Sequence, residues 1–336
     1  MTKRVKNRDL GAARKSKKDD FYTQLCDIEK ELKHYKEHFK GKVVYCNCDD
    51  PRISNFFHFF SYNFGKLGLK KVVATCYKNQ DMDLFSQNDS EQAIYLEYYG
   101  DKIGNNVPDP EEIGIKHLKG DGDFRSAETI ELLKQADVVV TNPPFSLFRE
   151  YVAQLIEYDK QFLIIGNVNA ITYKDVFQLI RENRLWLGPS IRSGDREFGV
   201  PDDYPLNAAG CRVDDDGKKY IRVKGVRWFT NLDFKERYED LILYKTYSQD
   251  AYLSFDNYDA INVDKTKEIP MDYDGVIGVP ITFLDKYSPK QFEIIGLIAG
   301  NIRGLAGIPS RIGKDGPYVN GKLKYGRILI RRRRES

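Results

Sequence analysis

Residues 137–145 read Asp-Val-Val-Val-Thr-Asn-Pro-Pro-Phe. The valine run is typical of a strand buried on both faces, and the two prolines end it because proline fixes φ and lacks an amide donor. Similar apolar runs occur at 42–46, 71–76 and 161–166, with helical periodicity between them. Strands that alternate with helices favour a parallel sheet covered on both faces. The right-handed crossover rule then predicts a doubly wound, Rossmann-like α/β domain.

The chain of 336 residues is long enough for one large domain or two of ordinary size. Residues 1–19 lack hydrophobic periodicity and predict a flexible basic arm. The alternating pattern occupies 20–234, and within it the polar, Gly- and Pro-containing segment 192–226 predicts a long functional loop. From residue 235 the composition shifts towards Tyr, Asp and Lys, which predicts an appended C-terminal region over 235–336.

Four local patterns predict further elements. Residues 185–191 and 220–231 are expected to form strands. Ser288-Pro289 is expected to start a short helix that runs through Ile295, because Ser favours the N-cap and Pro the first helical position. Asn320-Gly321 predicts a hairpin turn.

Cysteine usage and hydropathy indicate the cellular compartment in which we expect the protein. The five cysteines are scattered and odd in number, so they predict neither a disulfide framework nor a zinc site. No run of eighteen apolar residues predicts a membrane span, and the basic N-terminus does not resemble a secretory signal. We therefore expect a reducing, cytoplasmic location, no membrane contact and no metal.

The net charge of +3 is unevenly distributed. Residues 1–18 contain eight Lys or Arg and one acid, residues 322–336 contain seven and one, and the stretch between them is acidic. Basic ends on an acidic body favour a protein that approaches a polyanion with its termini, and Lys15, Lys17 and Lys18 are candidate contacts. Solvated tails without a ligand are the alternative interpretation.

The segment from Asn142 to Phe145 is the strongest candidate for chemistry. Ligands of a doubly wound sheet bind beyond the carboxyl ends of its strands, and this segment follows such an end. Because Pro143 and Pro144 lock the backbone, the Asn142 side-chain oxygen and the Pro143 carbonyl can accept both hydrogens of an exocyclic amine. Phe145 offers a flat apolar face for a base. The alternative is an ordinary strand-to-loop turn with a buried Phe.

Two acceptors answer a chemical problem of adenine. Its amine is a poor nucleophile because the lone pair is delocalised into the ring. Acceptors on both hydrogens favour a tetrahedral nitrogen whose lone pair faces an electrophile, so orientation and electrostatics do most of the catalytic work.

This motif resembles the fourth motif of the amino-methyltransferases that use S-adenosylmethionine, and the chain is more closely similar to the EcoRI-type adenine-specific DNA methyltransferases. Segments that share the resemblance lie throughout the chain, at 20–24, 44–51, 120–126, 141–148, 167–173, 256–262 and 278–283. The resemblance implies a Rossmann-like methyltransferase sheet with an appended target-recognition region. It also implies an adenine-N6 methyltransferase for duplex DNA, acting as the modification enzyme of a restriction–modification system.

The resemblance assigns cofactor contacts to two loops. Asp123 is expected to accept from the adenine amine of S-adenosylmethionine, and Phe124 to pack against that base; a turn or helix cap is the alternative for Asp123. Residues 46–51 occupy the place of the first motif but contain no glycine. Asp49 or Asp50 is therefore expected to receive the positively charged amino group of the cofactor.

The N-terminal segment adds one more cofactor residue. Tyr22, in Phe21-Tyr22-Thr23, resembles the family's N-terminal motif near the methionine end of the cofactor. Core packing is a strong alternative for these three side chains.

DNA contact requires that the adenine leave the duplex stack. Phe198 is expected to cover the flipped base from its second side, with an ordinary loop anchor as the alternative, and Arg196 lies beside it in sequence. The basic ends are expected to bind phosphates in a salt-dependent manner. Sequence readout is expected from 192–226 and from the region after residue 235.

Two other functions fit parts of the pattern. A protein-glutamine N5 methyltransferase shares Asn-Pro-Pro-Phe but needs neither basic ends nor a large recognition region. A catalytically inactive DNA-binding methyltransferase fold fits the glycine-free first motif but not an intact Asn142–Phe145. For the favoured function we expect a monomer that binds double-stranded DNA, with a cognate restriction endonuclease acting separately.

Overall fold

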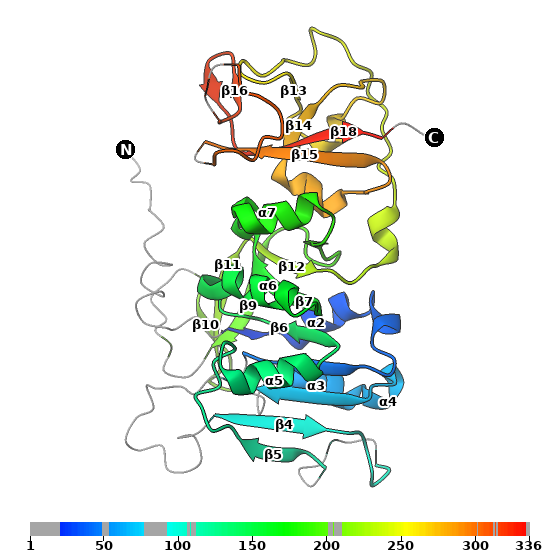
Figure 1. Cartoon of the computed structure of the whole chain (residues 1–336), viewed down its shortest axis with the longest axis vertical. Coiled ribbons are helices and arrows are strands. Elements are labelled where there is room, and N and C mark those ends of the chain that lie inside the picture. The colour runs from blue at the N-terminus through cyan, green and yellow to red at the C-terminus, as the bar shows by residue number, and fades with distance from the viewer. Residues whose placement is uncertain are drawn as a thin grey trace. The chain divides into compact units, whose positions relative to one another are not determined.

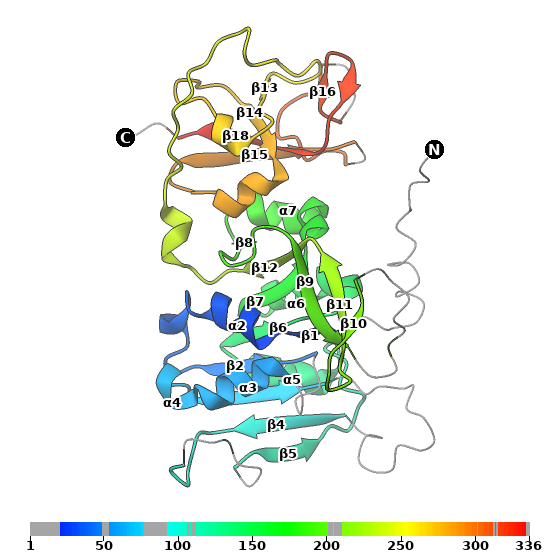
Figure 2. The same ribbon diagram turned by 180° about the vertical axis from the view of Figure 1, so that it is seen from behind.

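The protein is described by a computed structural model (Figures 1 and 2). The residues it describes are 21–48, 54–76, 93–105, 108, 112–200, 204, 210–300, 302–311, 313 and 315–333. The chain divides into two compact units: the first comprises 1–168 and 193–232, and the second comprises 169–192 and 233–336. Five candidate residues lie outside the described residues: Lys15, Lys17, Lys18, Asp49 and Asp50.

The first unit is built on a mixed sheet with strand order β5-β4-β3-β2-β6-β7-β12. Its central strands are parallel: β2 (Val43–Cys46), β3 (Lys71–Thr75), β6 (Val138–Thr141) and β7 (Gln161–Asn167). Its outer strands run antiparallel to their inner neighbours: β4 (Ile94–Tyr98), β5 (Gly114–His117) and β12 (Val226–Thr230). The predicted doubly wound α/β fold is confirmed, with antiparallel strands added on both sides of the parallel centre.

Helices cover both faces of this sheet (Figures 1 and 2). One face carries α2 (Leu25–Leu32), α3 (Asn55–Tyr62) and α4 (Phe64–Leu67), and the other carries α5 (Ala127–Gln135) and α6 (Phe148–Glu157). Apolar residues recur at helical spacing and form the buried faces: α3 buries Phe56, Phe57 and Phe60, and α6 buries Phe148, Tyr151, Val152 and Leu155. The sheet is therefore fixed from both sides.

The first unit also contains a small antiparallel sheet. Its strands follow the order β1 (Tyr22–Thr23), β9 (Asp195–Val200), β11 (Lys219–Lys224) and β10 (Arg212–Val213). The description of 192–226 as a loop is thus wrong for most of its described residues. The strand predicted over 220–231 is in fact β11 and β12, which belong to different sheets. Gly225 separates them with a φ of +70°, and a Cβ there would lie 2.9 Å from the Val168 side chain.

The second unit has a sheet of order β13 (Ile261–Asn262), β14 (Ile277–Pro280), β18 (Arg327–Arg332) and β15 (Phe292–Ile298). Its core includes Phe255, Tyr258, Val276, Ile298 and Leu329. Helix α7 (Lys174–Arg181) also belongs to this unit; it contacts β15, and its buried residues are Val176, Phe177 and Ile180. The segment 169–192 therefore groups with the C-terminal part, whereas the sequence-based boundary placed it before residue 234.

Three further short strands are β8 (Trp186–Leu187) and the hairpin strands β16 (Tyr318–Val319) and β17 (Lys322–Leu323). Short 3₁₀ helices lie at Lys36–His38, Phe145–Leu147, Val168–Thr172, Lys235–Tyr238, Thr266–Glu268 and Ile281–Lys286. Of the strand predicted over 185–191, only β8 is present. Among the described helices, none has the length and apolar character needed to cross a bilayer.

Two local predictions in the second unit have opposite outcomes. The hairpin at Asn320-Gly321 is confirmed, with φ values of 49° and 72° that match a type I′ turn. The helix predicted from Ser288 is wrong: the backbone makes one turn and then enters β15 at Phe292. The Ser288 hydroxyl does not cap a helix; it donates to Asp240 Oδ1 at 3.0 Å. The pairing of β15 with β18 is a tertiary interaction that the local pattern does not encode.

Gly166 of β7 is needed for the close packing of α6. A Cβ at this position would lie 2.4 Å from the Phe148 ring. We expect Gly166→Ala to lower the free energy of unfolding by about 1–3 kcal/mol through overpacking. Urea unfolding would measure the change. The matched control is Gly65→Ala in α4, where no atom lies within 4 Å of the added methyl group; it should preserve or raise stability. A Gly166→Ala variant as stable as the wild type would contradict the packing argument.

Candidate active site

Asn142 directly follows β6, and its side chain is 6% exposed. Its Nδ2 donates to the Phe21 carbonyl oxygen at 2.6 Å. A carbonyl can only accept, so the amide nitrogen must face Phe21 and the amide oxygen must face away from it. Within the described part of the chain, that buried Oδ1 has no hydrogen-bond partner. Because buried polar atoms are nearly always bonded, this oxygen is a strong candidate to accept from a ligand N–H group.

The residues after Asn142 form a tight turn. Pro143 is buried, and Pro144 and Phe145 are half-buried. The Pro144 carbonyl accepts from the Leu147 amide at 2.9 Å, which closes a single 3₁₀ turn before α6 begins. Phe145 therefore leaves the strand end with part of its ring accessible.

An aromatic cluster surrounds this turn, with Phe21 at its centre. The ring centroid of Phe21 lies 6.0 Å from those of Phe145 and Phe198 and 6.3 Å from that of Tyr204. Pairing of β1 with β9 sets Thr23 opposite Phe198 and so brings this segment to the Asn142 turn. Phe198 itself is only 1% exposed. Tyr204 was not predicted, because nothing but its aromatic ring distinguishes it in a polar segment.

The end of β2 is bound to its neighbours. The Thr141 hydroxyl donates to the Asn47 carbonyl, and the Tyr151 hydroxyl donates to the Asn47 side-chain oxygen. Burial raises the pKa of Tyr151 well above its ordinary value, so the phenol remains a proton donor. Cys48 follows with a φ of 83°, a conformation that usually requires glycine. The sequence analysis noted that 46–51 contain no glycine, but it did not predict that Cys48 would adopt this conformation.

Asp123 lies in the loop before α5. Its Oδ1 accepts from the Arg125 amide at 2.9 Å and from Arg125 Nε at 2.8 Å, and its Oδ2 accepts from Arg125 Nη2. The hydrogen bonds that the Arg125 guanidinium donates to Asp123 raise the pKa of Arg125. The N-cap of α5 is Ser126, whose hydroxyl accepts from the Thr129 amide. Asp123 therefore does shape a turn, as the alternative interpretation predicted.

Phe124 and Gly122 bring this loop to the strand ends. Phe124 is 7% exposed and lies edge-on to Tyr151, with ring centroids 5.1 Å apart. Gly122 has a φ of +77°, and a Cβ there would lie 2.0 Å from the Cys76 carbonyl oxygen, just after β3. Only glycine permits this approach. The ends of β2, β3 and β6 and the loop around Asp123 consequently meet along one edge of the sheet.

The other candidates lie on the small sheet. Tyr22 is half-buried on β1 and is paired with Gly199 of β9. Arg196 lies on β9, two residues before Phe198, and its Nε is 3.9 Å from an Asp27 carboxylate oxygen. In the described ranges, no group of three or more His, Cys, Asp or Glu side chains is placed to hold a metal ion.

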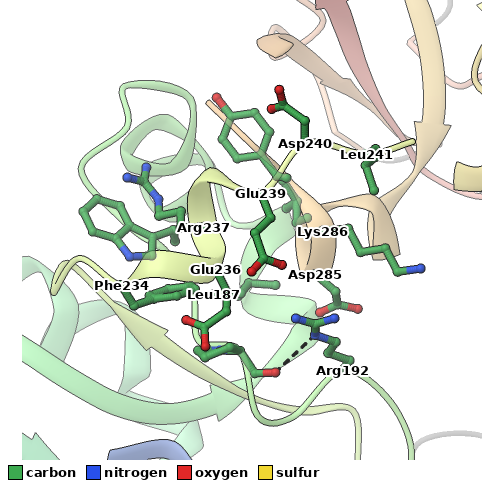
Figure 3. A pocket seen from close by; sticks show the side chains of 14 residues that line it. Leu187, Arg192, Phe234, Glu236, Arg237, Glu239, Asp240, Leu241, Asp285 and Lys286 are labelled. Atoms are coloured by element: carbon green, nitrogen blue, oxygen red, sulfur yellow. Dashed lines mark hydrogen bonds between the residues drawn. The ribbon is translucent and has the colours of Figure 1, made fainter. Parts of the chain in front are cut away.

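The second unit contains a separate pocket (Figure 3). Arg237 lies against it, with its guanidinium 3.7 Å from the Trp186 ring centroid. The lining mixes the acids Glu236, Glu239, Asp240 and Asp285 with the bases Arg192, Arg237 and Lys286. None of the residues around Asn142, Asp123 or Asn47 lines this pocket. Its mixed charge and lack of the motif residues separate it from the candidate active site.

Comparison with known proteins identifies the family. The family model of the adenine-specific methyltransferase EcoRI matches residues 9–333. The Type II methyltransferase M.EcoRI of Escherichia coli is 50% identical, and the alignment covers 99% of each chain. M.MpnI of Mycoplasma pneumoniae is 40% identical, over 96% of this chain and 97% of the relative. M.MgeORF184P of Mycoplasma genitalium is 38% identical, over 95% of this chain and 97% of the relative.

These matches span both structural units. The resemblance read from the motifs is thereby confirmed, and the chain belongs to the EcoRI family of adenine-specific methyltransferases.

Proposed function

We infer that this chain transfers a methyl group from S-adenosylmethionine to N6 of an adenine flipped out of duplex DNA. The observation that carries this inference is the buried Asn142 Oδ1, an acceptor with no partner among the described residues, beside the half-buried Phe145. A flipped base with an exocyclic amine supplies both a donor for that oxygen and a flat ring for that aromatic side chain.

The chain's own residues orient the amine. Asn142 Oδ1 accepts one amine hydrogen, and the Pro143 carbonyl accepts the other. The nitrogen lone pair is then available for attack, because both hydrogens are held on one side. When bound, the cofactor supplies a methyl group activated on a sulfonium sulfur. The sulfur of the bound cofactor would keep the electron pair of the C–S bond as the methyl group passes to nitrogen, and the methylated amine would release one proton to solvent. Positioning is the main contribution of the protein.

The cofactor is proposed to bind at the ends of β2 and β3 and in the loop around Asp123. Phe124 would form an apolar wall for its adenine, and a carboxylate oxygen of Asp123 would accept from the amine of that adenine. Asp49 or Asp50 would pair with its amino group, and Tyr22 would lie near its methionine end. The contacts that support this proposal are the bonds at Asn47 and the approach of Gly122 to Cys76.

DNA is proposed to meet both units. Phe198 and Arg196 would serve the target base and its surroundings, and Lys15, Lys17 and Lys18 would bind phosphates. Residues 192–226 and the second unit would read the sequence. We expect a cytoplasmic enzyme, because a modification enzyme must reach the DNA of its own cell. We also expect a monomer that acts beside a separate restriction endonuclease.

A protein-glutamine N5 methyltransferase shares Asn-Pro-Pro-Phe, but the match to an adenine-specific family over 9–333 favours DNA. An inactive DNA-binding fold would not need to keep the Asn142 acceptor in place. A cofactor-binding titration tests the inactive fold directly, since such a protein should bind S-adenosylmethionine poorly.

Modified-base sequencing tests the function most directly. The full chain would be expressed in a methylation-deficient host and its plasmid DNA sequenced. We expect N6-methyladenine at every copy of one short motif, with an Asn142→Ala plasmid as the matched blank. Unmodified adenine, despite folded protein that binds the cofactor, would overturn the proposal.

The role of Asn142 predicts a specific kinetic defect. Asn142→Ala should lower kcat by about 10²–10³-fold, the range found when one preorganised polar contact to a reacting centre is removed. Binding of DNA and cofactor should change little, because the amide contributes mainly to orientation. Single-turnover methylation and two binding titrations would measure these effects. Turnover close to the wild-type value would refute the assigned role.

The recognition role of 192–226 predicts a transferable specificity. The motifs of this enzyme and of M.MpnI or M.MgeORF184P would first be determined, and a relative with a different motif chosen. Exchange of 192–226 for the corresponding segment should change the methylated motif at one or more positions, because base-edge contacts set specificity. An active chimera with an unchanged motif would exclude this segment from sequence readout.

A further inference from the structure

Phe21, whose carbonyl accepts from Asn142, directly precedes strand β1, and a second asparagine, Asn55, binds β1 at Thr23. We propose that Asn55 is a positioning residue for methyl transfer: by fixing β1 it fixes the carbonyl that orients the Asn142 amide. This inference rests on the proposed function, and it adds a residue that neither the motif nor the family resemblance assigns.

Two side-chain amides bind the same short segment. Asn142 Nδ2 donates to the Phe21 carbonyl at 2.6 Å, and Asn55 Nδ2 donates to the Thr23 carbonyl at 2.7 Å. These carbonyls belong to residues two apart on an extended segment, so they point in the same direction. Since β1 is the terminal strand of its sheet, only one of its edges pairs with β9. The two asparagine amides thus donate to backbone carbonyls that, in a larger sheet, would accept from a neighbouring strand.

Asn55 is well placed to hold β1 rigidly. It is the first residue of α3, directly before Phe56 and Phe57, which are 0% and 3% exposed. Phe56 also contacts Trp228 of β12 edge-on, with ring centroids 6.1 Å apart. The helix is therefore anchored in the core of the first unit, and its amide ties β1 to that core.

Strand β1 is short, and the residue before it, Phe21, also packs in the aromatic cluster with Phe145 and Phe198. The strand is two residues long and pairs with β9 at only two positions. Such a short edge strand is held weakly by its ladder alone. If the Asn55 bond is lost, Phe21 can shift, and the Asn142 amide will shift or rotate with it. Small displacements of a reacting group have large effects on rate, of the order of 10²-fold for about 1 Å.

The kinetic expectation separates positioning from binding. By this proposal Asn55 touches neither the base nor the cofactor, so Asn55→Ala should lower kcat by about tenfold. The KM values for DNA and S-adenosylmethionine should stay within about twofold, because a positioning defect affects the transition state and not ground-state binding. Asn55→Asp is nearly isosteric but lacks the N–H group, so it should show the same defect. Asn55→Gln, which keeps the donor, should recover part of the rate.

The chain offers a matched control on the same helix. Asn63, the C-cap of α3, donates from Nδ2 to the Phe59 carbonyl at 2.9 Å and, among the described residues, makes no hydrogen bond to β1. Asn63→Ala should weaken the helix end to a similar degree and leave kcat unchanged. Urea unfolding of all variants would show whether the stability losses are comparable.

A double-mutant experiment tests whether Asn55 acts on the rate through Asn142. In the Asn142→Ala background, adding Asn55→Ala should lower the residual rate no further, because the group that Asn55 positions is already absent. Additive losses would show that Asn55 acts elsewhere and would overturn the proposal. So would an unchanged kcat in Asn55→Ala, an equal loss in Asn63→Ala, or a defect confined to KM. Should Asn55→Ala fail to fold, the Asp and Gln variants provide the same comparison.

Assays of the wild-type enzyme distinguish a failure of the positioning role from a failure of the proposed function. Adenine methylation by the wild type with normal kcat in Asn55→Ala would leave the function intact and refute the positioning role. A wild type that methylates no adenine would overturn the proposed function, and this inference with it.

Discussion

A side-chain amide has a donor end and an acceptor end, and burying both requires a partner for each. The arrangement around Asn142 follows from this constraint. Its nitrogen is bonded to the Phe21 carbonyl, so its oxygen is held in one orientation before any base arrives. The turn through Pro143 and Pro144, the aromatic cluster around Phe21 and the short strand β1 all serve to keep that amide in place. Preorganisation of this kind avoids a reorganisation cost during the reaction.

The parallel centre of the sheet supplies the rest of the site. Because parallel strands end at the same edge, the carboxyl ends of β2, β3 and β6 lie along one edge of the sheet. Thr141 and Tyr151 both donate to Asn47, so hydrogen bonds join the end of β6 to the residue that follows β2. The methyl donor and the methyl acceptor are thereby expected to be held by a single rigid edge.

Local patterns were sufficient for the elements that depend on local interactions. The valine-rich strands, the Asn320-Gly321 turn and the motif at the end of β6 could be predicted because each is encoded by adjacent residues. The sheet within 192–226 could not, since β9 is completed by Tyr22 and Thr23, far away in sequence. Ser288-Pro289 suits one helical turn, but pairing with β18 makes the next residues a strand. The left-handed Cys48 and the hydrogen bond from Tyr151 to the neighbouring Asn47 could not be predicted from sequence spacing either.

The contact between Phe21 and Asn142 also constrains how the enzyme is made. It joins residues 121 positions apart, and β1 is completed only by pairing at Gly199 and Phe198. Such non-local closure is slow relative to helix formation, and loop-closure entropy must be lost before the contact forms. During synthesis the parallel strands can assemble before β9 is available to pair with the segment that follows Phe21. Competence for methyl transfer would therefore arise late, after more than half of the chain has left the ribosome.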